Sequence, residues 1–204
     1  MILIAGGAGY IGSQVNKFLT QNGFETVVFD NLCRGHEETV KWGKLEIGDL
    51  AKVEEIERVF NKYPIEAVFD FVSFIEAGES VKDPEKFYFN NVVTTLNLLS
   101  VIRKHQVDKF IFSSTAATFG IPEYVPIDEI HPQRPINPYG KTKLMIEEIL
   151  KDYELAYGLK YVVFRYFNAA GADSDGEIGE WHQPESHLIP ILLEVALGKE
   201  NFFN

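Results

Sequence analysis

The sequence predicts an α/β protein with a parallel, doubly wound sheet, followed by the beginning of a smaller domain. Three observations support this prediction. Short apolar runs rich in β-branched residues alternate with longer segments of helical period, a glycine-rich turn directly follows the first run, and the composition changes near residue 173. Alternation of strands and helices favours a parallel sheet covered by helices. We therefore expect one domain over residues 1–172 and the start of a second over residues 173–204.

Six strands and five helices are expected from the pattern of apolar residues. The strand candidates are residues 1–5, 26–29, 44–47, 67–71, 109–112 and 161–164. The helix candidates, in which apolar residues recur every three or four positions, are residues 10–22, 52–62, 84–105, 138–157 and 188–197. Between residues 173 and 184 the chain is rich in glycine, aspartate and glutamate, which is typical of a loop. The boundary between the two expected domains is placed in that loop.

The charge balance limits the possible partners. With 19 Lys and Arg against 30 Asp and Glu, the formal net charge is -11, and the sequence has no cluster of basic residues. Because nucleic-acid backbones are bound by clustered Lys and Arg, a nucleic-acid partner is not expected. A phosphorylated ligand remains compatible with this charge, since helix N-termini and backbone amides bind phosphate without net positive charge.

Cysteine and histidine usage gives no sign of a metal centre. Cys33 is the only cysteine, so neither an intrachain disulfide nor a cysteine-based zinc site is expected. The histidines at positions 36, 105, 131, 182 and 187 lack metal-ligand spacing, and surface or loop positions are expected for them. We find no secretory segment and no apolar stretch long enough to span a bilayer, so we expect no membrane partner and a cytoplasmic location.

A glycine motif follows the first strand candidate and opens the first helix candidate. Gly6, Gly9 and Gly12 lie in the run GGAGYIG over residues 6–12. In dinucleotide-binding folds one such glycine permits a tight turn, one lets the backbone approach a pyrophosphate, and one lets helix and strand pack closely. The helix N-terminus adds free amides for the phosphates. A glycine-rich turn without a ligand is the alternative, but the strand before it and the helix after it favour a Rossmann-type site.

Carboxylates at the ends of the second and third strand candidates also point to a dinucleotide. Asp30 lies about 20 residues after the glycines, where a carboxylate binds the adenosine ribose of NAD and repels the 2′-phosphate of NADP. Arg34 is close enough in the sequence to pair with that phosphate and favour NADP instead. Asp30 and Asn31 are also good turn formers. Asp49 and Leu50 are expected at the ligand-binding edge of the sheet, although Asp49 also suits a helix N-cap.

A hydroxyl and a Tyr-x-x-x-Lys pair form the candidate reaction centre. Thr115 follows the fifth strand candidate, and Tyr139 and Lys143 stand at the beginning of the helix expected over residues 138–157. Residues four apart share one face of a helix. A nearby ammonium favours a phenolate, so we expect Lys143 to lower the pKa of Tyr139 from its ordinary value near 10. The pair would transfer protons while Thr115 positions a substrate oxygen. A surface pair without catalytic role is the alternative.

Several motifs, in order along essentially the whole chain, resemble those of the extended short-chain dehydrogenase/reductases, and among them the UDP-glucose (UDP-galactose) 4-epimerases. The motifs are residues 6–13, 30–32, 49–50, 78–80, 90–92, 112–120, 137–143 and 165–168. The resemblance implies a Rossmann-type domain, NAD as a regenerated cofactor, a UDP-sugar substrate, and a homodimer formed through residues 84–105 and 138–157. It implies interconversion of UDP-glucose and UDP-galactose through a 4-keto intermediate.

Together with the motifs above, the resemblance assigns residues to the site. The implied catalytic residues are Thr115, Tyr139 and Lys143. The implied cofactor-binding residues are Gly6, Gly9, Tyr10, Ile11, Gly12, Asp30, Asn31, Leu32, Cys33, Arg34, Gly35, Asp49, Leu50, Phe71, Val72, Ser73, Asn90, Tyr139, Lys143 and Phe167. The implied substrate-binding residues are Thr115, Asn168, His187 and Leu188.

The chain departs from the family pattern at three places and in its length. Asp70 stands where the family usually has histidine, and Phe119 replaces a usual tyrosine. Ile75 and Glu76 stand where a lysine often lies beside the cofactor phosphates, so this loop is expected to attract NAD less. Family members continue well beyond this length. We therefore expect residues 1–204 to bind NAD but to epimerise UDP-sugars poorly, because the uridine half of the site is incomplete.

Two other functions remain open from the sequence. A nucleotide-sugar dehydratase or decarboxylase of the same superfamily is the nearest. Dehydration needs an added acid and base beside the catalytic threonine, whereas the side chains of Ala116 and Ala117 have no group that can donate or accept a proton. A catalytically idle NAD-binding module is the second alternative. The alanines favour epimerisation over dehydration.

Overall fold

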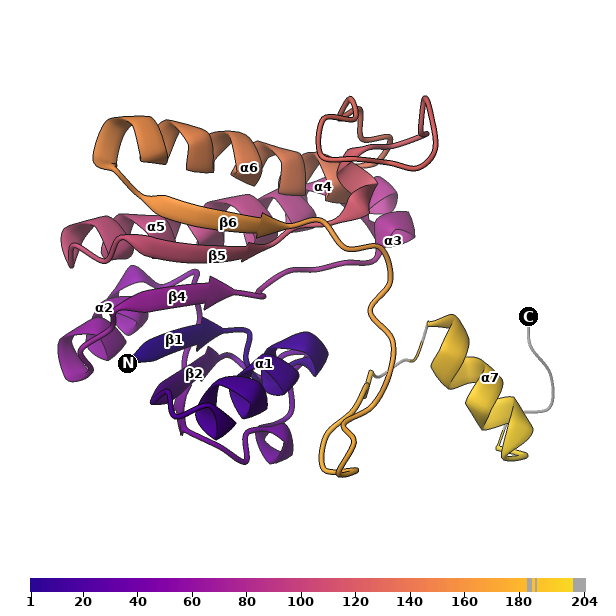
Figure 1. Ribbon diagram of the computed structural model, residues 1–204, viewed down its shortest axis with the longest axis horizontal. Coiled ribbons are helices and arrows are strands. Elements are labelled where there is room, and N and C mark those ends of the chain that lie inside the picture. The colour runs from indigo at the N-terminus through magenta and orange to yellow at the C-terminus, as the bar shows by residue number, and fades with distance from the viewer. Residues whose placement is uncertain (183–184, 186, 200–204) are drawn as a thin grey trace.

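The computed structural model describes residues 1–182, 185 and 187–199 of the chain. Its centre is a six-stranded, fully parallel sheet in the order β3-β2-β1-β4-β5-β6 (Figure 1). The strands are β1 (Ile2–Ala5), β2 (Thr26–Asp30), β3 (Lys44–Ile47), β4 (Ala67–Asp70), β5 (Lys109–Ser113) and β6 (Lys160–Phe164). The strand order reverses between β1 and β4, and such a switch point leaves a crevice at the carboxyl ends of the two strands.

Helices connect the strands and confirm the predicted α/β, doubly wound fold class. They are α1 (Tyr10–Gln21), α2 (Val53–Lys62), α3 (Ala77–Lys82), α4 (Pro84–Phe87), α5 (Thr94–Lys104), α6 (Pro138–Tyr157) and α7 (Leu188–Ala196). A π-helical segment, η2 (Tyr88–Val93), joins α4 to α5, and η1 (Glu37–Thr39) and η3 (Ala116–Thr118) are single 3-10 turns. The apolar pattern does not predict α3 or the two 3-10 turns, because elements this short have no periodicity to detect.

The predicted boundaries agree closely with the observed ones. Each predicted strand is present, with its ends shifted by at most one residue. The helix predicted over residues 84–105 is a continuous helical path made of α4, η2 and α5. Within it, the hydroxyl of Thr94 donates to the carbonyl oxygen of Asn90. The widened turn at η2 lies beside a cavity at the carboxyl ends of the strands, since Asn90 and Thr94 both line that cavity.

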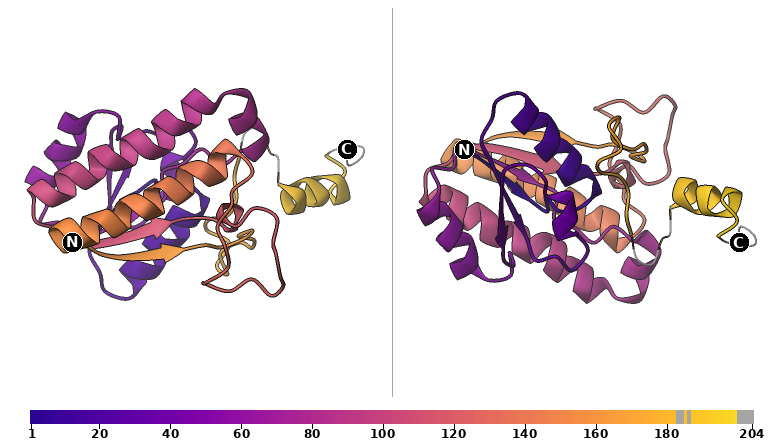
Figure 2. Two further views of the ribbon diagram at one scale, coloured as in Figure 1. Left: turned by 90° about the horizontal axis from the view of Figure 1, so that it is seen from above. Right: turned by 90° about the horizontal axis from the view of Figure 1, so that it is seen from below.

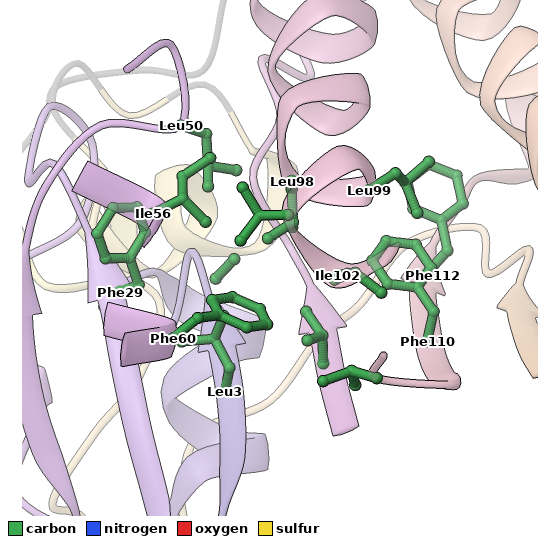
Figure 3. Packing of buried hydrophobic residues seen from close by; sticks show 14 of the residues in the cluster. Leu3, Phe29, Leu50, Ile56, Phe60, Leu98, Leu99, Ile102, Phe110 and Phe112 are labelled. Atoms are coloured by element: carbon green, nitrogen blue, oxygen red, sulfur yellow. The ribbon is translucent and has the colours of Figure 1, made fainter. Parts of the chain in front are cut away.

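Helices cover the two faces of the sheet unequally. α2, α5 and α6 pack on one face over the larger core, whereas α1 covers part of the other (Figure 1 and Figure 2). The centre of the larger core contains Leu3, Phe29, Ile56, Leu98 and Phe112, each at most 1% exposed (Figure 3). Burial of each such side chain contributes about 1.5–3 kcal/mol. The sheet is therefore a rigid base for the loops at the carboxyl ends of its strands.

The segment after β6 leaves the sheet and runs along its carboxyl edge towards α7 (Figure 1). Lys17 of α1 holds this segment through ion pairs of 2.7 Å to Asp173 and 2.6 Å to Asp175. α7 has no buried residue and stands apart from the sheet in every view (Figure 2). The last residues of the expected second domain, 200–204, lie outside the described residues. None of the helices described is both long and apolar enough to span a membrane.

Candidate active site

A cavity of about 630 Å³ lies at the carboxyl ends of the strands, around the switch point between β1 and β4. It is called the cleft below. From the predicted cofactor residues it is lined by Gly6, Gly9, Tyr10, Ile11, Gly12, Asp30, Asn31, Cys33, Arg34, Gly35, Asp49, Leu50, Phe71, Val72, Ser73, Asn90 and Phe167. From the predicted catalytic and substrate residues it is lined by Thr115, Tyr139, Lys143, Asn168, His187 and Leu188. Among all predicted site residues, Leu32 alone is absent from the lining.

The glycine loop between β1 and α1 packs so closely against neighbouring backbone that Gly6 and Gly12 leave no room for a side chain. Gly6 has a φ of 73°. A Cβ on Gly12 would lie 2.4 Å from the carbonyl oxygen of Gly6, so only glycine lets α1 begin this close to β1. A Cβ on Gly9 would meet only that same oxygen, at 3.4 Å, and the backbone here is open towards the cleft. The amides in the first turn of α1, which lack intrahelical partners, are therefore accessible to an anionic group.

Asp30 ties the glycine loop to the end of β2. Its carboxylate accepts hydrogen bonds from the backbone N–H groups of Ala8 at 3.0 Å and Leu32 at 2.9 Å. Burial raises the pKa of Asp30, and these two hydrogen bonds act in the opposite direction. Leu32 has a φ of 58°, and its side chain packs with Ile4 and Val28 in the smaller core. Leu32 therefore turns its side chain away from the cleft, and its amide helps to orient Asp30.

Arg34 and Glu76 join the loop after β2 to the loop after β4 through an ion pair of 2.9 Å. The Arg34 guanidinium also lies 5.8 Å from the centre of the Phe74 ring. The two charged side chains are 40% and 31% exposed, and a pair that is this open to solvent contributes at most about 1 kcal/mol. The negative charge of Glu76, which is expected to disfavour the cofactor phosphates, is offset by the positive charge of Arg34. The same pairing engages the arginine that would otherwise favour a 2′-phosphate.

Asp49 lies in the cleft wall and does not cap a helix. α2 begins at Val53 after Lys52, whose side chain makes no capping hydrogen bond. The carboxylate of Asp49 instead accepts from the backbone N–H of Ala51 at 2.8 Å and from the side-chain amide of Asn31 at 3.2 Å. The helix-cap interpretation of Asp49 is thus wrong. Asp49 links the loops after β2 and β3 at the cleft.

Lys143 lines the cleft together with Thr115 and Tyr139 and is 2% exposed. Its ammonium donates to the carbonyl oxygen of Ser113 at 2.7 Å and lies 4.8 Å from the centre of the Phe112 ring. Burial lowers the pKa of Lys143 to about 8, against the opposing influence of the carboxylates of Asp70 and Glu147. The lysine is therefore poised to gain or lose a proton just above neutral pH.

Tyr139 lies above Lys143 on the same face of α6, but its ionisation differs from the prediction. Its backbone N–H donates to the hydroxyl of Ser80 at 3.2 Å. Burial raises the pKa of Tyr139, and a hydrogen bond with Thr115 lowers it by less. The predicted lowering by Lys143 is wrong for this state, because the ammonium of Lys143 is turned to the carbonyl oxygen of Ser113.

The start of α6 is fixed against the turn that carries Thr115. Asn137 caps the helix by accepting from the backbone N–H of Gly140 at 2.8 Å, and Pro138 occupies the first turn. A Cβ on Gly140 would lie 2.6 Å from the carbonyl oxygen of Ala117, so glycine permits this close approach of α6 to η3. The helix start is what brings Tyr139 to Thr115.

The buried carboxylate of Glu147 links α6 to the residues that follow β5 and β6. Glu147 of α6 is 1% exposed and pairs with Arg165 at 2.7 Å. It also accepts hydrogen bonds from the amide of Gln133 at 2.9 Å and from the hydroxyl of Ser114. Buried charges need such complete pairing. Glu147 thereby fixes the end of β5, next to Thr115, to α6 and to the residue after β6.

This geometry has counterparts among known proteins. The model of the NAD dependent epimerase/dehydratase family matches residues 2–202. The chain belongs to this family. The UDP-glucose 4-epimerase of Rhizobium meliloti (strain 1021) is 54% identical over 202 residues, which are 99% of this chain and 62% of that protein. The chain therefore spans less than two thirds of the length of this curated relative.

Solved structures in the family have the same fold. The UDP-glucose 4-epimerase from Brucella ovis in complex with NAD has a TM-score of 0.97 and is 48% identical, over 99% of this chain and 62% of that one. The UDP-glucose 4-epimerase from Bifidobacterium longum in complex with NAD+ and UDP has a TM-score of 0.93 and is 36% identical, over 98% and 63%. These similarities confirm the predicted family resemblance.

The departures from the family pattern are accommodated locally. Asp70 is 1% exposed, and its carboxylate accepts from the backbone N–H of Val72 at 3.0 Å and the hydroxyl of Thr95 at 3.1 Å. Phe119 is 4% exposed and meets the ring of His131 edge-on, with 5.4 Å between ring centres. His131 is itself 3% exposed and lies in the loop between η3 and α6, so it takes a loop position, as expected, but is buried there.

The structure adds cleft residues to which the sequence motifs assign no role. The hydroxyls of Ser113 and Tyr166 are hydrogen-bonded to each other in the cleft wall beside Lys143. Both residues stand at the carboxyl ends of strands, the position at which this fold binds ligands, so that rule could have identified them. Glu180 and His182 also line the cleft. They do not directly follow a strand, so the strand-end rule does not identify them.

Proposed function

We propose that the protein interconverts UDP-glucose and UDP-galactose by NAD-dependent 4-epimerisation through a 4-keto intermediate. The observation that carries the proposal is the meeting of the glycine loop with Thr115, Tyr139 and Lys143 in one cleft. A dinucleotide site alone fits many oxidoreductases. The Tyr and Lys beside it add proton transfer. Ala116 and Ala117, which follow Thr115 in η3, offer no acid or base, and this favours epimerisation over dehydration.

We infer that NAD is the cofactor, because the residues present fit it. The open backbone at Gly9 and the first turn of α1 suit the pyrophosphate. The two carboxylate oxygens of Asp30 each accept one backbone N–H and keep capacity for ribose hydroxyls. Arg34 is engaged by Glu76 instead of facing a 2′-phosphate. When bound, NAD supplies the redox chemistry by accepting hydride from C4 of the sugar and returning it.

The chain's own residues then handle the proton of the sugar 4-hydroxyl. Tyr139, as phenolate, takes this proton while the C4–O bond becomes a carbonyl, and it returns the proton when the hydroxyl forms again. Thr115, which hydrogen-bonds to Tyr139, positions the same oxygen. Lys143 lies one helical turn further along α6 and, with a pKa of about 8, is mostly an ammonium at neutral pH. If the ammonium turned from the carbonyl oxygen of Ser113 to the phenol of Tyr139, its charge would favour the phenolate over the neutral phenol.

We propose that Asn168, His187 and Leu188 contact the nucleotide-sugar, and that a substrate-binding domain begins at residue 173. All three residues line the cleft. The Bifidobacterium longum structure holds UDP together with NAD+, which is consistent with a uridine site next to the cofactor. Because the curated relative is longer than this chain, we propose that part of the uridine site forms outside residues 1–204.

We further propose that the protein is a cytoplasmic homodimer formed through its α5 and α6 side. η2 and α6 contact each other, and Phe89, Val93 and Met145 on them are 53%, 40% and 45% exposed. Figure 2 shows the two helices side by side. Apolar side chains exposed together favour an interface. Cys33 is a free, exposed thiol, which suits a reducing compartment.

A coupled assay for UDP-glucose formation from UDP-galactose tests the function. It is run on residues 1–204 and on a version extended with the C-terminal segment of the Rhizobium meliloti relative. We expect both to bind NAD and only the extended version to turn over rapidly, because binding energy from uridine holds the sugar in a reactive position.

The matched variant for this assay is Tyr139→Phe in the extended version. It should lower turnover by roughly 10²–10⁴-fold and leave NAD binding nearly unchanged, since it removes one hydroxyl. Turnover of this variant at the unmodified rate would remove Tyr139 from the reaction. An extended version that binds NAD but produces no UDP-glucose would contradict the proposed function itself.

A further inference from the structure

Four potential metal ligands gather beside the cleft, in the segment that leads into α7. Glu180, His182, Glu185 and His187 each turn one donor atom inward, and these atoms all lie within 4.8 Å of one another. The Nδ1 atom of His187 is 2.9 Å from Oε1 of Glu180 and 3.2 Å from Oε1 of Glu185. The Nδ1 atom of His182 is 3.4 Å from the same oxygen of Glu180 and 3.8 Å from Oε2 of Glu185. All four residues are partly buried.

One polar atom of this cluster lacks a hydrogen-bond partner among the described residues. The Nδ1 atom of His182 is shielded from solvent and has no hydrogen-bond partner among the described residues. Buried polar atoms without a partner are rare in folded proteins, and each calls for an explanation. Two carboxylates held this close also repel each other unless a positive charge lies between them. A cation at the centre would give this imidazole nitrogen a partner and would lie between the two carboxylates.

We propose that Glu180, His182, Glu185 and His187 bind one divalent transition-metal ion of the zinc type. Zn²⁺ binds four ligands tetrahedrally, and bonds of about 2.0–2.2 Å place its donor atoms about 3.4 Å apart. The four nitrogen–oxygen distances given above run from 2.9 to 3.8 Å, around this value, and the donor set as a whole spans up to 4.8 Å. Imidazole nitrogen suits zinc and its neighbours, whereas Mg²⁺ and Ca²⁺ prefer sites made of oxygen alone.

The sequence pattern behind this cluster is a pair of Glu-x-His runs, at residues 180–182 and 185–187. The two histidines are five positions apart and have no ligand spacing by themselves. Each run contributes one carboxylate and one imidazole, and the set is complete only when the second run folds back on the first. This is why spacing between histidines alone predicts no metal.

The ion joins the segment around Trp181 to the segment that leads into α7. Trp181 stacks on His36, with 3.7 Å between ring centres and 8° between ring planes, and its carbonyl oxygen is 3.2 Å from Nε2 of His36. The first Glu-x-His run is thereby held to the loop after β2. The second run leads into α7, which has no buried residue. A closed four-ligand site is structural, so the ion fixes the start of α7 over the cleft and takes no part in proton transfer.

Zinc titration of residues 1–204 tests this proposal, which goes beyond the proposed enzymatic function. The protein is stripped with a chelator, dialysed, and titrated with Zn²⁺ in competition with a colorimetric chelator. We expect one zinc ion per chain, and Co²⁺ in its place with the strong visible absorption of a tetrahedral site. His182→Gln and Glu180→Gln should each weaken zinc binding by more than about tenfold, since even the loss of an outer-shell partner costs about that much.

The matched control is His105→Gln. Nε2 of His105 lies 2.8 Å from Glu57 in a His–Glu pair outside the cluster, so this variant should bind zinc like the unmodified chain. Zinc should raise the unfolding temperature of the unmodified chain and of His105→Gln, but not that of His182→Gln. Failure to bind zinc or cobalt stoichiometrically overturns the proposal, as does equal zinc binding by His182→Gln and the unmodified chain. NAD binding, measured on the same samples, separates this outcome from failure of the proposed function.

Discussion

The glycine loop after β1 and the segment that carries α7 border the same cleft, but they are packed in opposite ways. Around the glycine loop, Ala8 is 1% exposed, its N–H donates to Asp30, and its carbonyl oxygen accepts from the N–H of His36 at 3.0 Å. In α7, Leu188 and Leu193 are 56% and 57% exposed. Figure 1 shows the same contrast, with α1 against the sheet and α7 away from it.

The contrast separates two ways of building a ligand site. On the cofactor side, the shape of the cleft follows from backbone packing and from buried strands, so it is present before any ligand arrives. On the α7 side, position depends on side-chain tethers at a few points, such as Lys17 with Asp173 and His36 with Trp181. Substitutions that disturb the backbone packing of the glycine loop should therefore weaken NAD binding. Substitutions that remove one tether should loosen only the segment that carries α7.

The largest effect is expected from Gly12→Ala, which attacks the backbone packing of the cofactor side. Its Cβ would lie 2.4 Å from the carbonyl oxygen of Gly6, which cannot move without displacing β1. We expect NAD binding to fall below detection, with a lowered unfolding temperature. Gly78→Ala is the control, because the helical Gly78 has no atom within 4 Å of an added Cβ. It should leave NAD binding unchanged and stabilise the protein by about 0.5–1 kcal/mol. Similar behaviour of the two variants would contradict the packing argument.

A smaller effect, dependent on pH, is expected from the buried lysine. Lys143 has an ordinary pKa of 10.5 in the unfolded chain and about 8 in the folded protein. Between these values the unfolded chain binds more protons, so the contribution of Lys143 to stability rises with pH and is lost as pH falls through 8. Relative to Lys143→Met, the unmodified chain should gain about 1–3 kcal/mol of unfolding free energy between pH 7.5 and 10. Urea unfolding of both at each pH measures this difference, and a pH-independent difference would contradict the lowered pKa.

On the α7 side, Lys17→Met should release the segment after β6 without unfolding the sheet. The ammonium of Lys17 pairs with Asp173, and both side chains are only 7% exposed. We expect hydrogen exchange over residues 173–199 to become several-fold faster while exchange in β1 and β4 is unchanged. Lys41→Met is the control, since its pair with Glu177 spans 3.8 Å and is 42% and 46% exposed. Equal acceleration by both variants would show that Lys17 is not the tether.

The smallest effect is expected from Glu76→Gln, which frees Arg34. The unmodified chain should bind NAD more tightly than NADP, because Asp30 repels a 2′-phosphate. Glu76→Gln should narrow that preference by about fivefold at most, the equivalent of an exposed ion pair of about 1 kcal/mol. Glu79→Gln, which removes the partner of Lys86, is the control and should leave the preference unchanged. A preference of the unmodified chain for NADP would contradict this, because it would mean that Arg34 and not Asp30 decides which of the two cofactors binds more tightly.

Sequence reasoning succeeded where position along a strand decides the outcome. Asp30 ends a strand, and Asp49 and Thr115 follow strands. Because the parallel sheet brings the carboxyl ends of its strands to one edge, the gathering of these residues in the cleft is predictable. The same holds for Tyr139 and Lys143, since helical spacing puts them on one face.

It failed where the outcome depends on which way a side chain turns or on a fold-back of the chain. The pKa of Tyr139 is set by burial, because Lys143 points to a carbonyl oxygen instead of the phenol. Leu32 lies just after β2, which ends at Asp30, but its backbone conformation sends the side chain into the smaller core. The cluster of Glu180 and His187 depends on a loop closure that no periodic pattern encodes.

Calorimetric titration of residues 1–204 with NAD tests most directly whether the cofactor half of the cleft is complete in itself. We expect one NAD bound per chain, tighter than NADP, without any nucleotide-sugar present, because the glycine loop is tightly packed and Asp30 and Asp49 lie at the carboxyl ends of β2 and β3. The Lys17→Met variant, which loosens the α7 side, should bind NAD with the same affinity. Absence of NAD binding by the unmodified chain, or its loss in Lys17→Met, would contradict the separation of the two halves.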